Sequence, residues 1–177
     1  SDSWTKHEYN DDGQRVKSEY GGQSGVYNVA TYTYNNKGQL LSKLHDYDVD
    51  GIPDQIESFT YDSNGNITKQ ENFDATDGKS QYATVYEYDD QSRLISEKSY
   101  NSGSGTASMV MTCEYDNKNV GTCETDYSND GSVEKITIRT LDANGNLVLL
   151  EDDYDADGEF DSVTVNQFDP SGNVVYT

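Results

Sequence analysis

A short pattern of an aromatic residue, an acidic or amide residue and a glycine turn recurs along the whole of this 177-residue chain. The residues that lead the seven copies stand at positions 9, 34, 61, 88, 115, 141 and 168, so successive spacings are 25, 27, 27, 27, 26 and 27 residues. A nearly constant spacing of this size is typical of folds built from one repeated unit. The chain is therefore restricted to an array of equivalent units. The copies are Tyr9–Gln14, Tyr34–Gln39, Tyr61–Asn66, Tyr88–Arg93, Tyr115–Val120, Leu141–Asn146 and Phe168–Asn173.

Each copy predicts a β-hairpin. Segments rich in Tyr, Val and Thr come before the turn, as in Thr31–Tyr34 and Thr84–Tyr88, and apolar pairs such as Leu40–Leu41 follow it. The turn reads Asp or Asn, two variable residues and then Gly, which fits a type I turn followed by a residue of positive φ. Ser92 and Asn119 replace that glycine in two copies, and Ser92 is the weaker substitute.

Two strands in each of seven hairpins predict an all-β fold, an antiparallel meander of about 14 strands. Open sheets of more than ~10 strands tend to curl or split, so we expect a strongly curled or spiralling sheet. The 15 tyrosines suit a thin sheet, because each can bury its ring while its hydroxyl stays in water. We expect a single β-repeat domain over residues 1–177, with units at roughly 1–26, 27–54, 55–80, 81–108, 109–134, 135–161 and 162–177.

The turn sequence Tyr61-Asp62-Ser63-Asn64-Gly65-Asn66 and its counterparts resemble the YD repeats of the RHS family. The resemblance implies long spirals of β-hairpins, which in that family form shells around secreted toxin segments or parts of cell-surface proteins. This chain departs from the family pattern in its longer, acidic connecting loops. Seven units are also too few to enclose a cavity, so we do not expect the chain to encapsulate cargo.

One connecting loop predicts a calcium site. From Asp46 onward, acidic residues occupy positions 1, 3, 5, 9 and 12 of the loop, and Gly51 stands at position 6. This is the oxygen-ligand spacing of an EF-hand loop, in which the glycine permits a sharp turn and an acid at position 12 binds with both oxygens. The loop is also similar to the aspartate loops of thrombospondin type 3 and FG-GAP repeats. The expected ligands are Asp46, Asp48, Asp50, Asp54 and Glu57.

Two further loops repeat this spacing less completely. The loop from Asp153 has Thr164 at position 12, which predicts a weaker or reshaped site, and the loop from Asp126 is a weaker version again. Oxygen ligands without His or Cys favour Ca²⁺ over zinc, copper or iron. The alternative is that these loops are solvated acidic turns without an ion. The expected ligands are Asp153, Asp155, Asp157 and Asp161 in one loop, and Asp126, Ser128 and Asp130 in the other.

The remaining loops are not expected to bind calcium. An extra residue breaks the spacing in residues 72–78, and residues 20–25 and 100–105 lack the acids.

Cys113 and Cys123 flank the fifth turn and predict a disulfide. If Asp116 pairs with Val120 across that turn, the two cysteines fall directly opposite each other on neighbouring strands. The alternative is a pair of reduced thiols. An exported protein would favour the bonded form.

Charge excludes several classes of partner. The chain has 33 acidic and 12 basic residues, a net charge of −21, which repels nucleic acid and anionic membranes. No run of 18 apolar residues exists, so no transmembrane segment is expected, and Ser1–Trp4 does not read as a signal peptide. His7 and His45 belong to no catalytic or metal pattern.

These observations predict a non-enzymatic, calcium-binding structural or adhesive module of a bacterial secreted or cell-surface protein. Its partners would be calcium and a cell-surface protein or glycan. A carbohydrate- or protein-binding module that uses exposed tyrosines is the first alternative, and a polysaccharide hydrolase with an acidic pair is the second.

Overall fold

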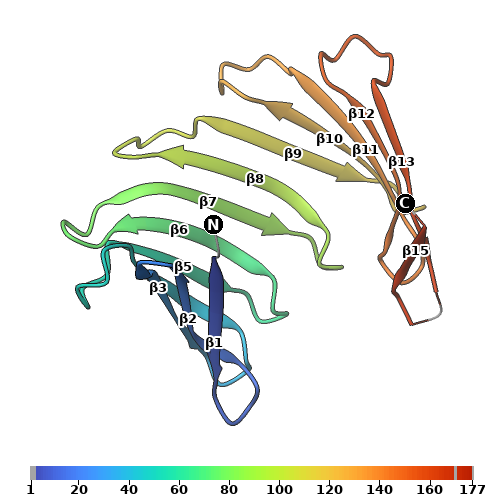
Figure 1. Cartoon of the computed structure of the whole chain (residues 1–177). Coiled ribbons are helices and arrows are strands. Elements are labelled where there is room, and N and C mark those ends of the chain that lie inside the picture. Colours follow the sequence, from blue (N-terminus) through green and yellow to red (C-terminus); the bar gives the residue numbers. More distant parts are fainter. Residues whose placement is uncertain (1–2, 170, 177) are drawn as a thin grey trace. The chain divides into compact units, whose positions relative to one another are not determined.

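The computed structural model describes residues 3–169 and 171–176, and all regular elements in that part of the chain are β-strands (Figure 1). Pro170, inside the seventh expected turn, lies outside the described residues. The strands are β1 (Trp4–Tyr9), β2 (Arg15–Gly22), β3 (Gly25–Tyr34), β4 (Leu40–Asp46), β5 (Gln55–Tyr61), β6 (Ile67–Asp74), β7 (Ser80–Tyr88), β8 (Leu94–Asn101), β9 (Met109–Tyr115), β10 (Val120–Asp126), β11 (Lys135–Leu141), β12 (Leu147–Asp153), β13 (Ser162–Val165), β14 (Gln167–Phe168) and β15 (Val174–Tyr176).

Strand order follows chain order from β1 to β13 in one 13-stranded sheet, and β14 pairs with β15 in a separate two-stranded sheet. The predicted all-β antiparallel meander is confirmed. The break before the last hairpin falls at Asn166, whose backbone N–H donates to Val148 O at 2.9 Å and whose side-chain amide donates to Leu147 O at 3.1 Å. The chain forms two compact units, residues 1–85 with 100–105, and residues 86–99 with 106–177. The strong curl of the sheet stays a prediction.

In all seven hairpin turns the residue at the fourth position has the predicted positive φ, and its N–H donates to the carbonyl group of the first residue. In the third turn, Asp62 Oδ1 accepts the backbone N–H groups of Asn64 and Asn66, each at 2.9 Å, and the Gly65 N–H donates to Asp62 O at 3.3 Å. Ser92 and Asn119 adopt positive φ values of 61° and 62°, as their positions in the repeat require. Glycines with positive φ complete the other five turns, at Gly13, Gly38, Gly65, Gly145 and Gly172.

The first three hairpins are joined to one another by tyrosine hydroxyl groups. Tyr34 Oη donates to Arg15 O, and Tyr61 Oη donates to Leu40 O, both at 2.8 Å. In each case the tyrosine that leads one turn binds a carbonyl group just beyond the preceding turn. In these three hairpins the sequence repeat is therefore also a repeat in tertiary contacts.

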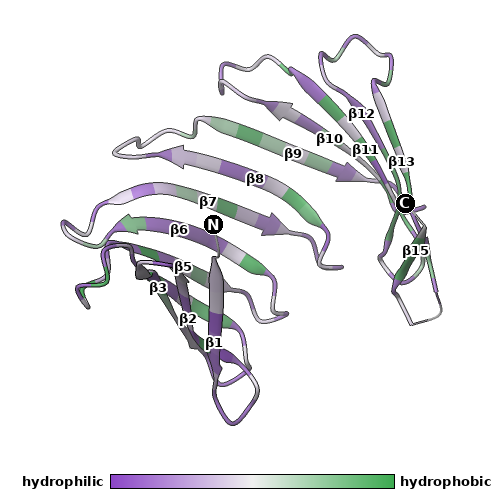
Figure 2. Ribbon diagram, in the orientation of Figure 1, coloured by the Kyte–Doolittle hydropathy of each residue, from purple (hydrophilic) through white to green (hydrophobic). Residues whose placement is uncertain are grey.

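The core is thin and made of small side chains. Ala30, Ala83 and Met111 are buried, together with the two cysteines, whereas many aromatic and aliphatic residues are exposed. Along the strands, hydrophilic and hydrophobic residues are interspersed (Figure 2).

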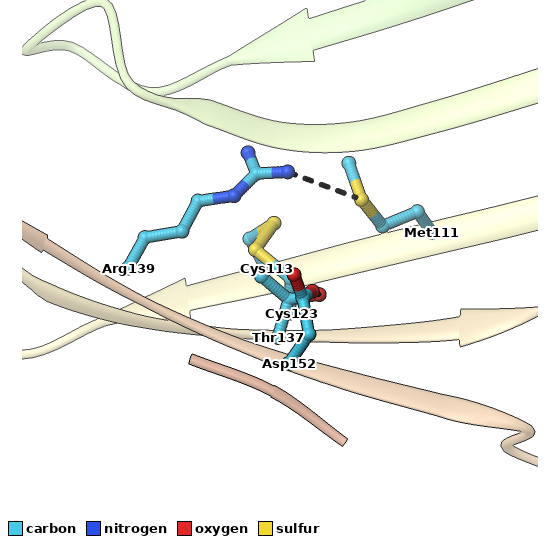
Figure 3. Close-up of a disulfide and its surroundings, with 6 residues drawn as sticks. All are labelled: Met111, Cys113, Cys123, Thr137, Arg139 and Asp152. Carbon is cyan, nitrogen blue, oxygen red and sulfur yellow. Dashed lines mark hydrogen bonds between the residues drawn. A yellow bond between two sulfur atoms is a disulfide. The ribbon is translucent and has the colours of Figure 1, made fainter. Parts of the chain in front are cut away.

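Cys113 and Cys123 form the predicted disulfide between β9 and β10 (Figure 3). The two residues are direct partners in the strand register, and their Cα atoms are 4.0 Å apart. Met111 packs beside them, and Arg139 Nη2 lies 3.9 Å from its sulfur. The disulfide therefore sits at the centre of the buried cluster in the second unit.

Candidate metal centres

Three connections between hairpins share one acidic pattern, and we call them the acidic loops. They are residues 46–54, 126–134 and 153–161, which begin at the last residue of β4, β10 and β12, respectively. Each has Asp at its first position, Tyr at its second, Asp at its fifth, Gly at its sixth and an acid at its ninth. The first loop belongs to the first unit and the other two belong to the second.

The first aspartate of each acidic loop accepts hydrogen bonds from the backbone of its own loop. Asp46 Oδ2 accepts the Gly51 N–H at 2.9 Å. The same bond joins Asp126 to Gly131 at 2.7 Å, and Asp153 to Gly158 at 2.8 Å. The loop backbone therefore wraps around this carboxylate in all three cases.

The ninth residue closes each loop from the other side. Its carboxylate accepts the backbone N–H of the tyrosine at the second position, at 2.6 Å in Asp54, 2.8 Å in Glu134 and 2.7 Å in Asp161. Its own N–H returns to the strand before the loop, as Asp54 does to His45 O at 2.7 Å. The same closure recurs at Glu134 and Asp161.

The backbone of the acidic loops is left-handed at two positions. Glycine occupies the sixth position, where Gly51, for example, has φ 88°. The fourth position is also left-handed, although it carries Val49 (φ 63°), Asn129 (φ 53°) or Ala156 (φ 56°). Non-glycine residues seldom adopt this conformation, and a β-branched residue does so least easily.

Each acidic loop brings three carboxylates together. Within each group, one oxygen from every member lies within 4.8 Å of the others. Oxygens at this separation can converge on one cation, which would be held by hard ligands of the kind that Ca²⁺ prefers. The groups are Asp46, Asp48 and Asp50; Asp126, Asp130 and Glu134; and Asp153, Asp155 and Asp161.

These groups overlap only in part with the expected ligand sets. Asp54 lies at the loop closure and is not in the first group, and Asp157 is not in the third. Glu57 lies on β5, where its Oε1 accepts the side-chain amide of Gln70 at 2.7 Å. Ser128 lies beside the second group, with its hydroxyl 3.5 Å from Asp126 Oδ1.

Glu134 is the member that the sequence reasoning missed. It stands at the ninth position of its loop, where the other two loops carry Asp54 and Asp161. Alignment of the three loops on their glycines would have found it.

Crowding of negative charge is evident in the third group. The charge of Asp157 raises the pKa of Asp155, with further contributions from burial and from Asp161 and Asp153. At Asp153, burial raises the pKa, but the backbone N–H groups, Gly158 first, together lower it further, so that it lies below its ordinary value. The loop thus stabilises one carboxylate with backbone dipoles and leaves a neighbouring one repelled.

The loop with the broken spacing is different. In residues 74–79, the Lys79 ammonium group lies 2.5 Å from Asp77 Oδ2. This contact lowers the pKa of Asp77. Here the Lys79 ammonium group neutralises one carboxylate, whereas within the described residues no such cation forms an ion pair with the clustered carboxylates of the acidic loops.

Comparison with known proteins shows likeness at the level of structure. No protein-family model matches the chain, and no curated protein matches it in sequence. Two crystal structures do match, TcdB2–TccC3 with Cdc42 and TcdB2–TccC3 without its hypervariable C-terminal region, both with a TM-score of 0.57 and 18% identity. They cover 95% and 98% of this chain, which spans 9% of theirs. The shared feature is the fold.

The match supports an RHS-like β-repeat fold, the one that the turn sequences predicted. A porin-like protein from Bacteroides uniformis also matches, with a TM-score of 0.51, 12% identity and coverage of 96% of this chain and 78% of its own. In the described part of the chain, no helix has the length and apolar character needed to cross a membrane.

Proposed function

We propose that this chain is a non-enzymatic, calcium-binding β-repeat module with a structural or adhesive role in a bacterial secreted or cell-surface protein. One observation carries the proposal: three loops gather three carboxylates each on the same framework of backbone hydrogen bonds. Ca²⁺ would neutralise these groups, order the loops and fix the angle between successive hairpins. In this way it would set the curl of the sheet.

The surrounding charge supports a cation as the ligand. The chain carries a net charge of −21, and the raised pKa of Asp155 reflects repulsion that a bound cation would relieve. The extracellular setting is supported by the disulfide, because such bonds persist in oxidising compartments. The likeness to a porin-like protein of Bacteroides uniformis supports a bacterial surface protein.

A catalytic role is less well supported. A contact that resembles an activated nucleophile joins His7 Nδ1 to Ser18 Oγ at 2.9 Å. Ser18 is completely buried, so its hydroxyl cannot meet a substrate. In the first and third acidic loops, the first aspartate of each cluster is held by backbone N–H groups of its own loop rather than facing another acid across a cleft.

The test is thermal unfolding in chelator and in calcium. An ion that binds only the folded state stabilises it by mass action. At affinities typical of extracellular modules, 10 mM calcium would add about 1.4 to 2.7 kcal/mol for each occupied site. An unchanged melting temperature would refute calcium binding.

A pair of variants separates an ion site from an acidic turn. Asp48→Asn with Asp50→Asn should gain stability in chelator and lose most of the calcium response of its loop. Asp11→Asn with Asp12→Asn removes the same charge from an exposed hairpin turn and serves as the matched control. It should shift the melting temperature equally in both buffers. If the Asp48 and Asp50 pair also shifted the melting temperature equally in chelator and in calcium, the acidic loop would be an ordinary turn.

A further inference from the structure

The edge of each unit that carries the hairpin turns is hollowed between successive turns. In the first unit, a cavity of about 340 Å³ lies between the turns that begin at Asn35 and Asp62. In the second unit, cavities of about 230 Å³ and 500 Å³ lie on either side of the turn Asp142–Gly145. The cavities of about 340 Å³ and 500 Å³ fall within the range of small-ligand sites, about 300–1,000 Å³, and the third is smaller. The acidic loops take no part in lining them.

Asn144 lines both cavities of the second unit. It is the third residue of its turn and is exposed, and its backbone N–H is already bonded to Asp142 Oδ1 at 2.8 Å. Its side-chain amide can therefore meet a ligand that crosses the turn from one cavity to the other. A long, linear ligand fits this arrangement better than a compact one.

The walls of the larger cavity offer hydrogen bonds of both kinds. Asn146 Nδ2 donates one hydrogen to Asp142 Oδ2 at 2.9 Å and retains a second. Asp169 lines the same cavity and is paired with Asn173 in the same manner, at 3.0 Å. Such pairs can donate to one hydroxyl group and accept from the next.

An aromatic ring completes the larger cavity. Phe168, on β14, is half-buried and lines it beside Asp142 and Asp169. An aromatic ring next to fixed polar groups can pack against the C–H face of a sugar while its hydroxyls are bonded. The same combination occurs in the first unit, where Tyr61 lines the cavity with Asn36 and Gln39.

The backbone argues against a peptide ligand. In the turn Asp142–Gly145, the N–H groups of Asp142, Asn144 and Gly145 are all bonded within the turn. A peptide that adds to a protein edge relies on a continuous row of free main-chain groups, and a turn with three of its four N–H groups already bonded does not offer such a row. Side chains are therefore the main source of recognition at this turn.

The distance between successive hairpin turns and the charge around them restrict the class of ligand further. Successive turns along the sheet are two strands apart, about 10 Å, which is comparable with one disaccharide of an extended β-1,4-linked glycan. Equivalent sugars would thus meet equivalent turns. The carboxylates of Asp142 and Asp169, within a chain of net charge −21, disfavour a polyanionic glycan.

We propose that the turn edge of the second unit, centred on Asn144 and Phe168, binds a neutral β-1,4-linked polysaccharide. This site lies apart from the acidic loops and is independent of the calcium proposal. A chain of sugars would cross the turn Asp142–Gly145, with its apolar face on Phe168.

The test is calorimetric titration of the full chain with cellohexaose and chitohexaose, in calcium and again in chelator below the melting temperature. Hexagalacturonate serves as the anionic comparison. At least one neutral hexasaccharide should bind in both buffers, and hexagalacturonate should not. Absence of binding by both neutral probes at millimolar concentration, or tighter binding of hexagalacturonate, would overturn the proposal.

Two turn variants locate the site. Asn144→Ala should weaken binding about tenfold, through the loss of hydrogen bonds to the sugar. Asn64→Ala is the matched control, because Asn64 holds the same turn position and makes the same backbone bond, to Asp62 Oδ1 at 2.9 Å. It should leave the affinity unchanged, and equal loss in both variants would contradict the assignment.

The variant Phe168→Leu tests the proposed site independently of Asn144. It keeps an apolar side chain and removes the aromatic face, so it should also weaken binding while the melting temperature confirms folding. Unaltered affinity in this variant would exclude Phe168 from the site.

Discussion

Val49 holds the least favourable backbone conformation for its residue type in the acidic loops. It is β-branched and has φ 63°, whereas the equivalent position of the second acidic loop carries Asn129, a residue that tolerates this region better. The loop keeps this conformation because Asp46 Oδ1 accepts the Val49 N–H at 2.7 Å and Asp46 Oδ2 binds Gly51. Local strain is thus balanced by bonds to one carboxylate.

Replacing Val49 with Gly should therefore stabilise the protein. The left-handed conformation costs a residue with a side chain about 1–2 kcal/mol, and added chain entropy takes back about 0.5–1 kcal/mol, so a net gain of roughly 0.5–1 kcal/mol is expected. Val133→Gly is the control, because Val133 is equally exposed, at 38%, but is not left-handed. It should lose stability in chemical denaturation, and a loss in both variants would show that Val49 is unstrained.

The residues of the site show where sequence reasoning succeeds and where it stops. The seven turn positions and the opposed cysteines follow from local rules, and the structure has them. Glu57 was expected from the acid spacing of an EF-hand loop, although strands rather than helices flank the loop in this chain. Here β5 begins at Gln55, and an extended chain carries a residue three positions beyond Asp54 about 10 Å onward. The position of Glu57 depends on the strand after the loop, which the spacing of acids does not determine, so its role as a ligand stays a prediction.

At the scale of the element, the hairpin turns differ in how they depend on pH. Five begin with Asp, and the pKa of each of those carboxyl groups is lowered. At Asp62 the leading cause is the side-chain amide of Asn66. Asn10 and Asn35 accept the same backbone bonds in the first two turns without a charge.

The lowered pKa values predict loss of stability in acid. A carboxyl group whose pKa is lower in the folded state contributes fully above its ordinary pKa of 3.8 and loses that contribution as pH falls through the folded value. Asp62→Asn should thus be less stable than the parent near pH 7, by a difference that shrinks toward pH 3. Melting temperatures across this range test it, with Asp11→Asn as control. A difference independent of pH would contradict the assignment.

At the scale of the whole molecule, the disulfide belongs to only one of the two compact units. It joins β9 to β10, in the unit of residues 86–99 and 106–177. In a repeat array, each hairpin contacts mainly its neighbours, so a local change need not spread through the chain. The two units can therefore differ in stability.

Reduction of the disulfide should affect the second unit selectively. Opening a closed loop of 11 residues costs about 3 kcal/mol in the chain-entropy model. Hydrogen exchange followed by mass spectrometry should become faster in residues 106–177 and stay unchanged in residues 3–85. Cys113→Ala with Cys123→Ala should reproduce the effect. Uniformly faster exchange would show that the two units unfold together.

The two edges of the meander differ in how freely their lengths vary. On the turn edge, the first four connections each have five residues: 10–14, 35–39, 62–66 and 89–93. On the other edge, they range from two residues (23–24) to eight (47–54). Because the strand register is set at the hairpin turns, insertions into the connections on this other edge leave strand pairing intact. Within each unit, foreign peptides grafted into these connections would be presented in a row without redesign of the sheet.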